Sequence, residues 1–354
     1  MHSALRSWIV CVAAGAGITA AAAAQQRPVK VFVLAGQSNM EGKAQDELWE
    51  RQAVAAETKE FFAPFRRNGN KNWVARDDVW IKFFDRRGPL TLGYGSPRRS
   101  GCEFAFGLRV GDALEAPVLL IKTAWGGRSL QRDFRPPSAG MPSEQDLQAE
   151  LERVRQQVQK RNEKNRRDDP LPTMADIEAR YGASYREMID EVRDTLARFD
   201  DLFPQWRGRG HQLSGFVWFQ GWNDQYEGAE QHYADNLRHL IVDVRKDLGV
   251  AALPVVVAAM GQNGGEPAKG AMKVIQDAQL AIADVDGFAG NVRAMRTDDL
   301  QDEAAAAVYP EWKERQEEWR RVGSDRPYHY LGSAIWMSRI GYRMADEMLE
   351  LLAR

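Results

Sequence analysis

The chain has 354 residues, of which 44% are hydrophobic and 28% charged, a composition typical of a globular protein. Its formal net charge of −2 argues against a nucleic-acid partner, which would require a basic surface, so we expect none. After the N-terminal segment, no stretch of about 18 consecutive apolar residues could span a bilayer. The length suits one large α/β domain with insertions.

The first two dozen residues have the layout of a cleaved secretory signal. Arg6 precedes an apolar run, Trp8 to Ala24, that is rich in Ala and Gly and ends on small residues. An uncleaved membrane helix is the alternative, but the run is rich in Ala rather than Leu. We therefore expect residues 1–24 to be a signal peptide and residues 25–354 to form a single exported domain, periplasmic or extracellular, with no membrane span after cleavage.

The first predicted strand leads directly into a polar turn. Val31 to Leu34 are apolar, and Ala35 and Gly36 then precede Gln37-Ser38-Asn39-Met40. A short apolar run closed by Gly is typical of a buried strand in a parallel sheet, where ligands bind beyond the carboxyl ends of the strands. Ser38 at that edge is either the N-cap of a helix or a nucleophile, and this stretch alone favours the cap.

Further strands and helices alternate along the chain, which indicates a parallel sheet covered by helices. Predicted strands span residues 79–84, 117–121, 215–219, 254–260 and 291–295. Predicted helices span residues 103–116, 230–249, 268–283, 304–321 and 332–352. The alternation is broken at about 136–209 by two charged, amphipathic helical segments, 144–167 and 175–202, which we interpret as a helical insertion rather than a separate domain.

Several of these segment ends carry the groups that ester hydrolysis needs. A serine nucleophile requires a base, which is often histidine, and a carboxylate that orients the base. His329 precedes the last helix, with Asp325 four residues upstream. Backbone N–H groups at Gly126-Gly127 and the side chain of Asn223 could bind an oxyanion. Taken one at a time, each feature is explained at least as well by a turn, a cap or a structural histidine.

Together, however, these stretches resemble the ordered motif blocks of the SGNH hydrolases. More narrowly, the chain is similar to the sialate O-acetylesterase-like, carbohydrate esterase family 6-type branch, in which G-Q-S-N-M and Q-G-x-N/S-D are usual. The resemblance covers almost the whole chain after the signal. It implies a three-layer α/β/α sandwich around a mostly parallel, about five-stranded flavodoxin-like sheet. The blocks in this chain are Gly36-Gln37-Ser38-Asn39-Met40, Gly126-Gly127, Gln220-Gly221-Trp222-Asn223-Asp224 and His329.

The resemblance also implies roles for individual residues. Ser38 would be the nucleophile and His329 the general base. The oxyanion hole would be formed by the backbone N–H of Ser38, a glycine of Gly126-Gly127, and Asn223. The residues expected to contact the substrate or border its pocket are Gln37, Gln220, Trp222 and Arg128.

Two positions depart from the family pattern. The acid of SGNH enzymes usually lies three residues before the histidine, where this chain has Arg326. Asp325 would serve if the chain bends there; the alternatives are a Ser–His pair without an acid, or a carboxylate from Asp298 or Asp299. Trp222 stands where this branch often has Glu, and its indole is suited to stacking on a sugar ring.

The predicted reaction is removal of an O-acetyl group from carbohydrate through an acyl-enzyme. No cofactor or metal is expected, since the sequence lacks HExxH, CxxC and paired histidine ligands. Arg128, Arg132 and Arg135 follow the glycine pair and either meet an anionic saccharide or face solvent. The alternatives are a lipase or thioesterase on the same fold and a carbohydrate-binding protein without catalysis. The glycan, the acetyl position and the oligomeric state are left open.

Overall fold

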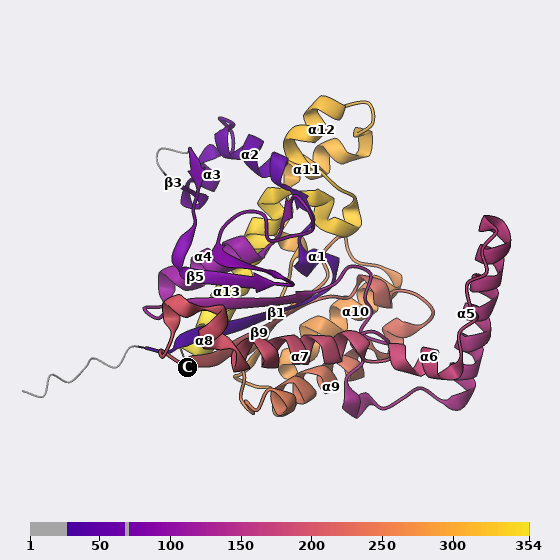
Figure 1. Cartoon of the computed structure of the whole chain (residues 1–354). Coiled ribbons are helices and arrows are strands. Elements are labelled where there is room, and N and C mark those ends of the chain that lie inside the picture. Colours follow the sequence, from indigo (N-terminus) through magenta and orange to yellow (C-terminus); the bar gives the residue numbers. More distant parts are fainter. Residues whose placement is uncertain (1–26, 68–70, 354) are drawn as a thin grey trace, which may run out of the picture.

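The computed structural model describes residues 27–67 and 71–353, so the predicted signal peptide at residues 1–24 lies outside the described residues. In these ranges a mostly parallel sheet of seven strands lies between two layers of helices (Figure 1). The strands are β1 (Val29–Gly36), β5 (Arg76–Phe83), β6 (Arg86–Leu90), β8 (Val118–Ala124), β9 (His211–Phe219), β10 (Val255–Ala258) and β11 (Val292–Met295). Their order in the sheet is β11-β10-β9-β1-β8-β5-β6.

The sheet is larger than the predicted five strands, and that prediction was wrong. Strands β8-β1-β9-β10-β11 are parallel and follow the order of a doubly wound, flavodoxin-like sheet. Strand β5 adds a further parallel strand beside β8, and β6 pairs antiparallel with β5. The sequence of β6 contains Gly88 and Pro89, which predict a turn. Proline is tolerated in β6 because an edge strand does not need every backbone N–H for pairing.

Strand β1 is buried on both faces, which explains its continuous apolar run. Phe32 and Leu34 point into one core, whereas Val31 and Val33 point into the other. The helices that cover the first face are α4 (Glu103–Ala113) and α13 (Ala334–Leu352), and those that cover the second are α7 (Ala183–Ala197), α9 (Tyr233–Asp247) and α10 (Gly270–Ala281) (Figure 1).

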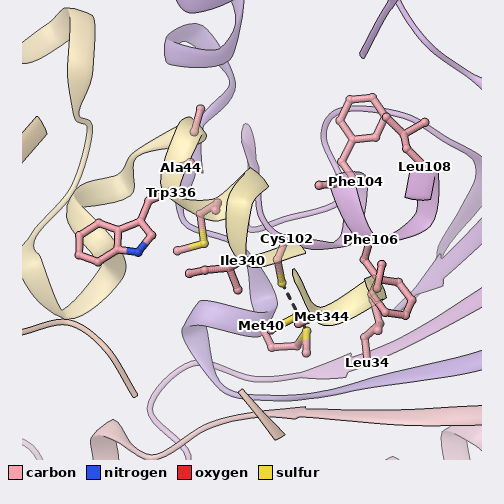
Figure 2. Close-up of a cluster of buried hydrophobic side chains, with 14 of the residues drawn as sticks. Leu34, Met40, Ala44, Cys102, Phe104, Phe106, Leu108, Trp336, Ile340 and Met344 are labelled. Carbon is pink, nitrogen blue, oxygen red and sulfur yellow. Dashed lines mark hydrogen bonds between the residues drawn. The ribbon is translucent and has the colours of Figure 1, made fainter. Parts of the chain in front are cut away.

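The turn after β1 is held between α4 and α13. It forms α1 (Ser38–Glu41), a single helical turn whose Met40 is fully buried. Figure 2 shows Met40 beside Cys102 and Met344, with Met40 Sδ and Cys102 Sγ 3.8 Å apart. Burial of a methionine side chain contributes roughly 1.5–3 kcal/mol. The Met40 contact therefore helps to hold the neighbouring Ser38 in place relative to the sheet.

The segment between β8 and β9 forms four helices. Helix α7 packs on the sheet, while α5 and α6 share a small separate core around Leu147, Leu151 and Ile177. The single helix predicted for residues 175–202 is interrupted at Gly182, whose φ is +68°. Figure 1 shows the far end of α5 standing away from the rest of the fold. Besides α7, these helices are α5 (Glu144–Asn165), α6 (Met174–Arg180) and α8 (Phe199–Leu202).

The remaining elements lie around this framework. The helix predicted for residues 304–321 is two helices, because Pro310 falls between them. In the described part of the chain, no helix has both the length and the apolar character needed to cross a membrane. The remaining helices are α2 (Asp46–Val54), α3 (Lys59–Phe62), α11 (Glu303–Val308) and α12 (Gln316–Val322), and two small sheets pair β2 (Ala44–Gln45) with β7 (Arg99–Ser100) and β3 (Arg66–Arg67) with β4 (Asn72–Trp73).

Candidate active site

The carboxyl ends of three neighbouring strands are level at one edge of the sheet. Strand β1 pairs with β8 on one side and β9 on the other, and Gly36 lies opposite both Ala124 and Phe219. The polar segments that follow these strands therefore begin side by side. They are Gln37-Ser38 after β1, Gly126-Gly127 after β8 and Gln220 to Asp224 after β9.

Gly36 makes the sharp turn below Ser38 possible. Its φ is +153°, and a Cβ at this position would lie only 2.1 Å from the carbonyl oxygen of Phe219. Helix α1 begins directly afterwards, with Gln37 as its N-cap and Ser38 as its first residue. Ser38 is therefore not the N-cap that its local sequence favours. Its hydroxyl makes no hydrogen bond to any residue that the structure describes.

The buried amide of Gln37 connects the end of β1 to the segment after β9. Its Oε1 accepts hydrogen bonds from the backbone N–H of Gly221 (3.2 Å) and of Asn223 (3.3 Å). Since Oε1 is engaged with these backbone groups, Nε2 is the end of the amide that contacts the Asn223 side chain, and it donates to Asn223 Oδ1 at 2.9 Å. Because this bond occupies the amide oxygen of Asn223, the Nδ2 group is left to donate elsewhere.

Three candidate oxyanion donors follow the ends of β1, β8 and β9. As the first residue of α1, Ser38 has a backbone N–H without an acceptor inside the helix. A Cβ built on Gly126 would lie 3.9 Å from Ser38 Cβ, so this glycine is close to the hydroxyl-bearing carbon. Gly127 has a φ of +74° and nothing within 4 Å of its missing Cβ, which leaves its side of the turn open. Asn223 contributes the Nδ2 group described above.

Asp224 fixes the loop after β8 against the loop after β9. This fully buried carboxylate accepts hydrogen bonds from the backbone N–H of Leu130 (2.8 Å) and Gln131 (2.7 Å) and from Gln220 Nε2 (2.6 Å). Burial raises the pKa of Asp224 to about 6, although these three hydrogen bonds act in the opposite direction. The sequence marked Asp224 only as part of a motif block and did not indicate this role.

A buried ion pair between Lys122 and Glu103 contacts the last residue of α1. Lys122 Nζ donates to the carbonyl oxygen of Glu41 at 2.8 Å and lies 3.2 Å from Glu103 Oε2, with both side chains fully buried. Burial lowers the pKa of Lys122, whereas the charge of Glu103 acts to raise it. Lys122 therefore ties the end of the Ser38 helix to strand β8 and helix α4.

His329 lies in a 3₁₀ segment, Pro327–Gly332, and Asp325 lies two residues before that segment. His329 Nδ1 is 3.2 Å from Asp325 Oδ2, within ion-pair distance, but the two groups are not aligned as a hydrogen bond. Burial acts to raise the pKa of Asp325. The contact with His329, the Arg326 backbone N–H and the nearby Arg99 outweigh it, so the pKa is lowered.

The backbone of this segment explains why a four-residue spacing works. Arg326 is extended, and the turn that begins at Pro327 then reverses the chain, with the His329 N–H donating to the carbonyl oxygen of Arg326 at 2.9 Å, so that His329 lies beside Asp325. Arg326 instead stacks over the Trp312 ring at 4.5 Å. Asp298 pairs with Arg296, and Asp299 lies 4.0 Å from an Arg343 nitrogen. Of the carboxylates considered from the sequence, the structure therefore places Asp325 next to the imidazole.

Two residues after His329 adopt left-handed backbone conformations. Tyr330 and Leu331 have φ values of +53° and +58°, each at a cost of about 1–3 kcal/mol for a non-glycine residue. Buried hydrogen bonds offset this cost, because the Tyr330 hydroxyl accepts from the Gly261 N–H (3.0 Å) and bonds to Thr297 (2.7 Å). This strained turn brings the chain back to α1, where Asn39 Nδ2 donates to the carbonyl oxygen of Tyr328 at 3.1 Å.

The sequence matches the model of the family described as "Carbohydrate esterase, sialic acid-specific acetylesterase" over residues 28–166 and 173–307. The chain belongs to this family. It is therefore a hydrolase that acts on carbohydrate acetyl esters. The matched region includes Ser38, Gly126 and Asn223 but ends before Asp325 and His329. No curated protein matches the sequence significantly.

Among solved structures, the esterase is similar in fold to a protein of Arabidopsis thaliana. The two share 16% sequence identity with a TM-score of 0.52, over 91% of this chain and 98% of the other. A carbohydrate acetylesterase from Xanthomonas citri matches at 13% identity and a TM-score of 0.46, over 77% of this chain and 51% of the other. The protein NanS matches at 13% identity and a TM-score of 0.41, over 78% of this chain and 79% of the other.

Two of the four residues predicted to contact substrate are buried inside the esterase. Gln37 is 1% exposed and Gln220 is 2% exposed. Gln220 Nε2 donates to Asp224 and to the carbonyl oxygen of Arg128 (3.0 Å), while its Oε1 accepts from the Tyr233 hydroxyl (3.0 Å). Both glutamines are fully engaged within the protein. Their geometry suits positioning of the loops rather than contact with a ligand.

The other two residues lie at the surface of the site. Trp222 is half-buried and packs against Tyr328 with ring centroids 5.8 Å apart, and Tyr328 in turn contacts the His329 ring at 4.5 Å. This aromatic pair borders the imidazole. Arg128 is exposed, and its guanidinium lies 3.2 Å from Asp133.

The three arginines after the glycine pair all have partners. Arg132 lies within 4 Å of both Asp133 and Glu150, and Arg135 donates to backbone carbonyl oxygens of Gln131, Ala139 and Gly140. Within residues 27–67 and 71–353, no three His, Cys, Asp or Glu side chains are grouped so that they could hold a metal ion. The groups that the site offers for chemistry are therefore the hydroxyl of Ser38, the imidazole of His329 and the surrounding N–H donors.

Proposed function

We propose that this esterase removes O-acetyl groups from carbohydrate through a covalent acyl-enzyme on Ser38, with His329 as general base and Asp325 as the acid that orients it. One observation carries the proposal. The Gln37 amide holds Asn223 Oδ1, and so leaves Asn223 Nδ2 without a hydrogen-bond acceptor among the described residues, beside the level strand ends where Ser38 and Gly126 lie close together. That arrangement supplies preorganised donors at the place where an oxyanion would form.

In the first step, Ser38 Oγ attacks the acetyl carbonyl carbon and His329 accepts the hydroxyl proton. Negative charge develops on the carbonyl oxygen and is stabilised by the N–H groups of Ser38 and Gly126 or Gly127 and by Asn223 Nδ2. The tetrahedral intermediate then collapses. The sugar hydroxyl leaves with the proton from His329, and the acetyl group remains on Ser38.

In the second step, water attacks the acetyl-Ser38 ester while His329 accepts its proton, and acetate is released. Asp325, an ionised carboxylate near neutral pH whose pKa is lowered further by its contacts, stabilises the imidazolium that forms in both steps. The Ser38 hydroxyl makes no hydrogen bond within residues 27–67 and 71–353. Catalytic hydrogen bonds of this kind often shorten only when the substrate binds.

We further propose that the protein is exported, because residues 1–24 have the pattern of a cleaved signal. The test is N-terminal sequencing of the protein recovered outside the cytoplasm. A mature N-terminus near Gln25 is expected, and a protein retained in the cytoplasm with Met1 intact would refute export.

The test of the catalytic proposal compares wild type with Ser38→Ala. We expect the variant to lose at least about a hundredfold in acetate release from acetylated xylo-oligosaccharides and from p-nitrophenyl acetate. Ser138→Ala, at an exposed serine, is the matched control and should retain wild-type activity. Full activity in Ser38→Ala would end the serine mechanism. Glycan binding without turnover in wild type would instead favour a carbohydrate-binding protein on this fold.

A further inference from the structure

A cavity of about 600 Å³ adjoins the proposed oxyanion hole and extends to helix α5. Gly127 and Asn223 line it on the side of the sheet, and Glu150 and Arg153 line it on the side of α5. In Figure 1, α5 stands on the side toward which the parallel strands run. A sugar whose acetyl carbonyl is bound by the oxyanion donors would extend into the space beside them. The cavity is that space, and the segment between β8 and β9 supplies its outer wall.

The charges that line this cavity are mainly negative. Two guanidinium groups, those of Arg132 and Arg153, face four carboxylates. Both arginines already have carboxylate partners, since Arg153 lies 2.7 Å from Glu227, and Arg132 lies 3.5 Å from Asp133 and 3.6 Å from Glu150. An anionic sugar would have to displace these partners and would face the remaining negative charge. The carboxylates that line the cavity are Asp133, Asp146, Glu150 and Glu227.

Glu150 offers a buried acceptor, Oε1, that receives no hydrogen bond from the described residues, although the Arg132 guanidinium lies 3.6 Å from it. Glu150 is 8% exposed, and its Oε2 accepts a hydrogen bond from the Tyr181 hydroxyl. A buried polar atom that makes no hydrogen bond is costly, and an ionised carboxylate can only accept. A sugar hydroxyl can donate to Oε1, whereas the carboxylate of an acidic sugar has no proton to give.

We propose that this cavity binds the sugar next to the acetyl group and selects uncharged O-acetylated saccharides over those that carry a carboxylate, with Glu150 accepting a hydrogen bond from a sugar hydroxyl. This inference rests on the proposed function, because it takes Ser38 and its neighbours as the place of cleavage. It concerns this chain alone, since the family is described by its action on sialic acid, which is an acidic sugar.

The first test uses wild-type protein and three substrates: acetylated xylo-oligosaccharides, a 9-O-acetylated sialic acid, and the 1-carboxamide of that sialic acid. We expect kcat/KM to be at least about tenfold higher for the neutral oligosaccharide than for the free sialic acid. Conversion of the carboxylate to the carboxamide should raise kcat/KM for the sialic acid most of the way to the value for the neutral oligosaccharide. High salt should reduce the difference in kcat/KM between the neutral and the acidic substrate, because screening weakens electrostatic repulsion.

A preference for the free sialic acid, or a carboxamide that is a poorer substrate than the acid, would overturn the inference while the proposed function stands. Failure of all three glycans and of p-nitrophenyl acetate would refute the proposed function itself, and the inference with it. These outcomes are distinguishable because p-nitrophenyl acetate carries no sugar and reports only on cleavage at Ser38.

The second test replaces Glu150 by Gln, which keeps an acceptor for Tyr181 but removes the negative charge. The Glu150→Gln variant should show a kcat/KM for the neutral glycan lower by about tenfold, relative to its own kcat/KM for p-nitrophenyl acetate. Its discrimination against the acidic sugar should also weaken. Glu163→Gln, at an exposed position on the same helix, is the matched control. Identical glycan kinetics in the two variants would refute the role of Glu150.

Discussion

The orientation of the Asn223 amide gives the sharpest test of the site. Gln37 Nε2 is the only atom of that side chain that can donate, and it donates to Asn223 Oδ1. The substitution Gln37→Glu has almost the same shape but places a second acceptor at this position. Asn223 would then have to turn its Nδ2 group toward residue 37. The candidate oxyanion hole would lose one donor, although no atom in contact with the substrate had been removed.

The expected magnitude follows from that single lost donor. Removal of one side-chain donor from an oxyanion hole costs about 10²–10³ in kcat, or about 2.7–4 kcal/mol in transition-state stabilisation. Initial rates on p-nitrophenyl acetate measure this loss, and thermal unfolding checks that the variant remains folded. The double variant with Asn223→Ala should be no slower than Asn223→Ala alone, because both changes remove the same donor. Wild-type kcat in Gln37→Glu, or losses that multiply in the double variant, would refute this reasoning.

Three further outcomes follow from the structure. Asp325→Asn should lower kcat/KM by about a hundredfold or more, measured on the same substrate, since the imidazolium loses its ionised partner; unchanged activity would exclude Asp325 as the acid. The pKa of Asp224 is raised to about 6 in the folded protein. As the pH rises, Asp224 therefore loses its proton in the unfolded chain before it does so in the folded protein, and its contribution to the free energy of unfolding falls between about pH 4 and about pH 6. The melting temperature of Asp224→Asn, followed over that range, should therefore vary less with pH than that of wild type, and parallel curves would contradict the assignment. Gly36→Ala should lower the free energy of unfolding by about 2–4 kcal/mol in urea titrations, because its Cβ would meet the carbonyl oxygen of Phe219 at 2.1 Å; a stability equal to wild type would show that the turn can relax.

The position of the site at the sheet edge could be predicted from local sequence. The apolar run of β1 ends at Gly36, and a strand buried on both faces requires such a run. The same rule located β8 and β9 and so predicted that the segments after them would meet. It failed for β6, since Gly88 and Pro89 predict a turn and the strand forms only because β5 offers a free edge.

The role of individual side chains depended on partners far away in the chain. Gln37 and Asn223 are separated by 186 positions, and no local pattern predicts that one amide fixes the direction of the other. The glutamines expected to contact substrate are instead buried in hydrogen-bond networks. The left-handed turn after His329, likewise, is held by the hydrogen bonds that the Tyr330 hydroxyl makes with Gly261 and Thr297.

The sequence by itself therefore determined which residues stand at strand ends, because strand formation and tight turns depend on the nearest neighbours in the chain. Only the tertiary structure decided that Asp325 rather than Asp298 lies beside His329, and that Glu150 of a distant helix faces the cavity next to Asn223. Hydrogen bonds, ion pairs and cavities form between groups that folding brings together. Their partners are set by packing in three dimensions and not by sequence spacing.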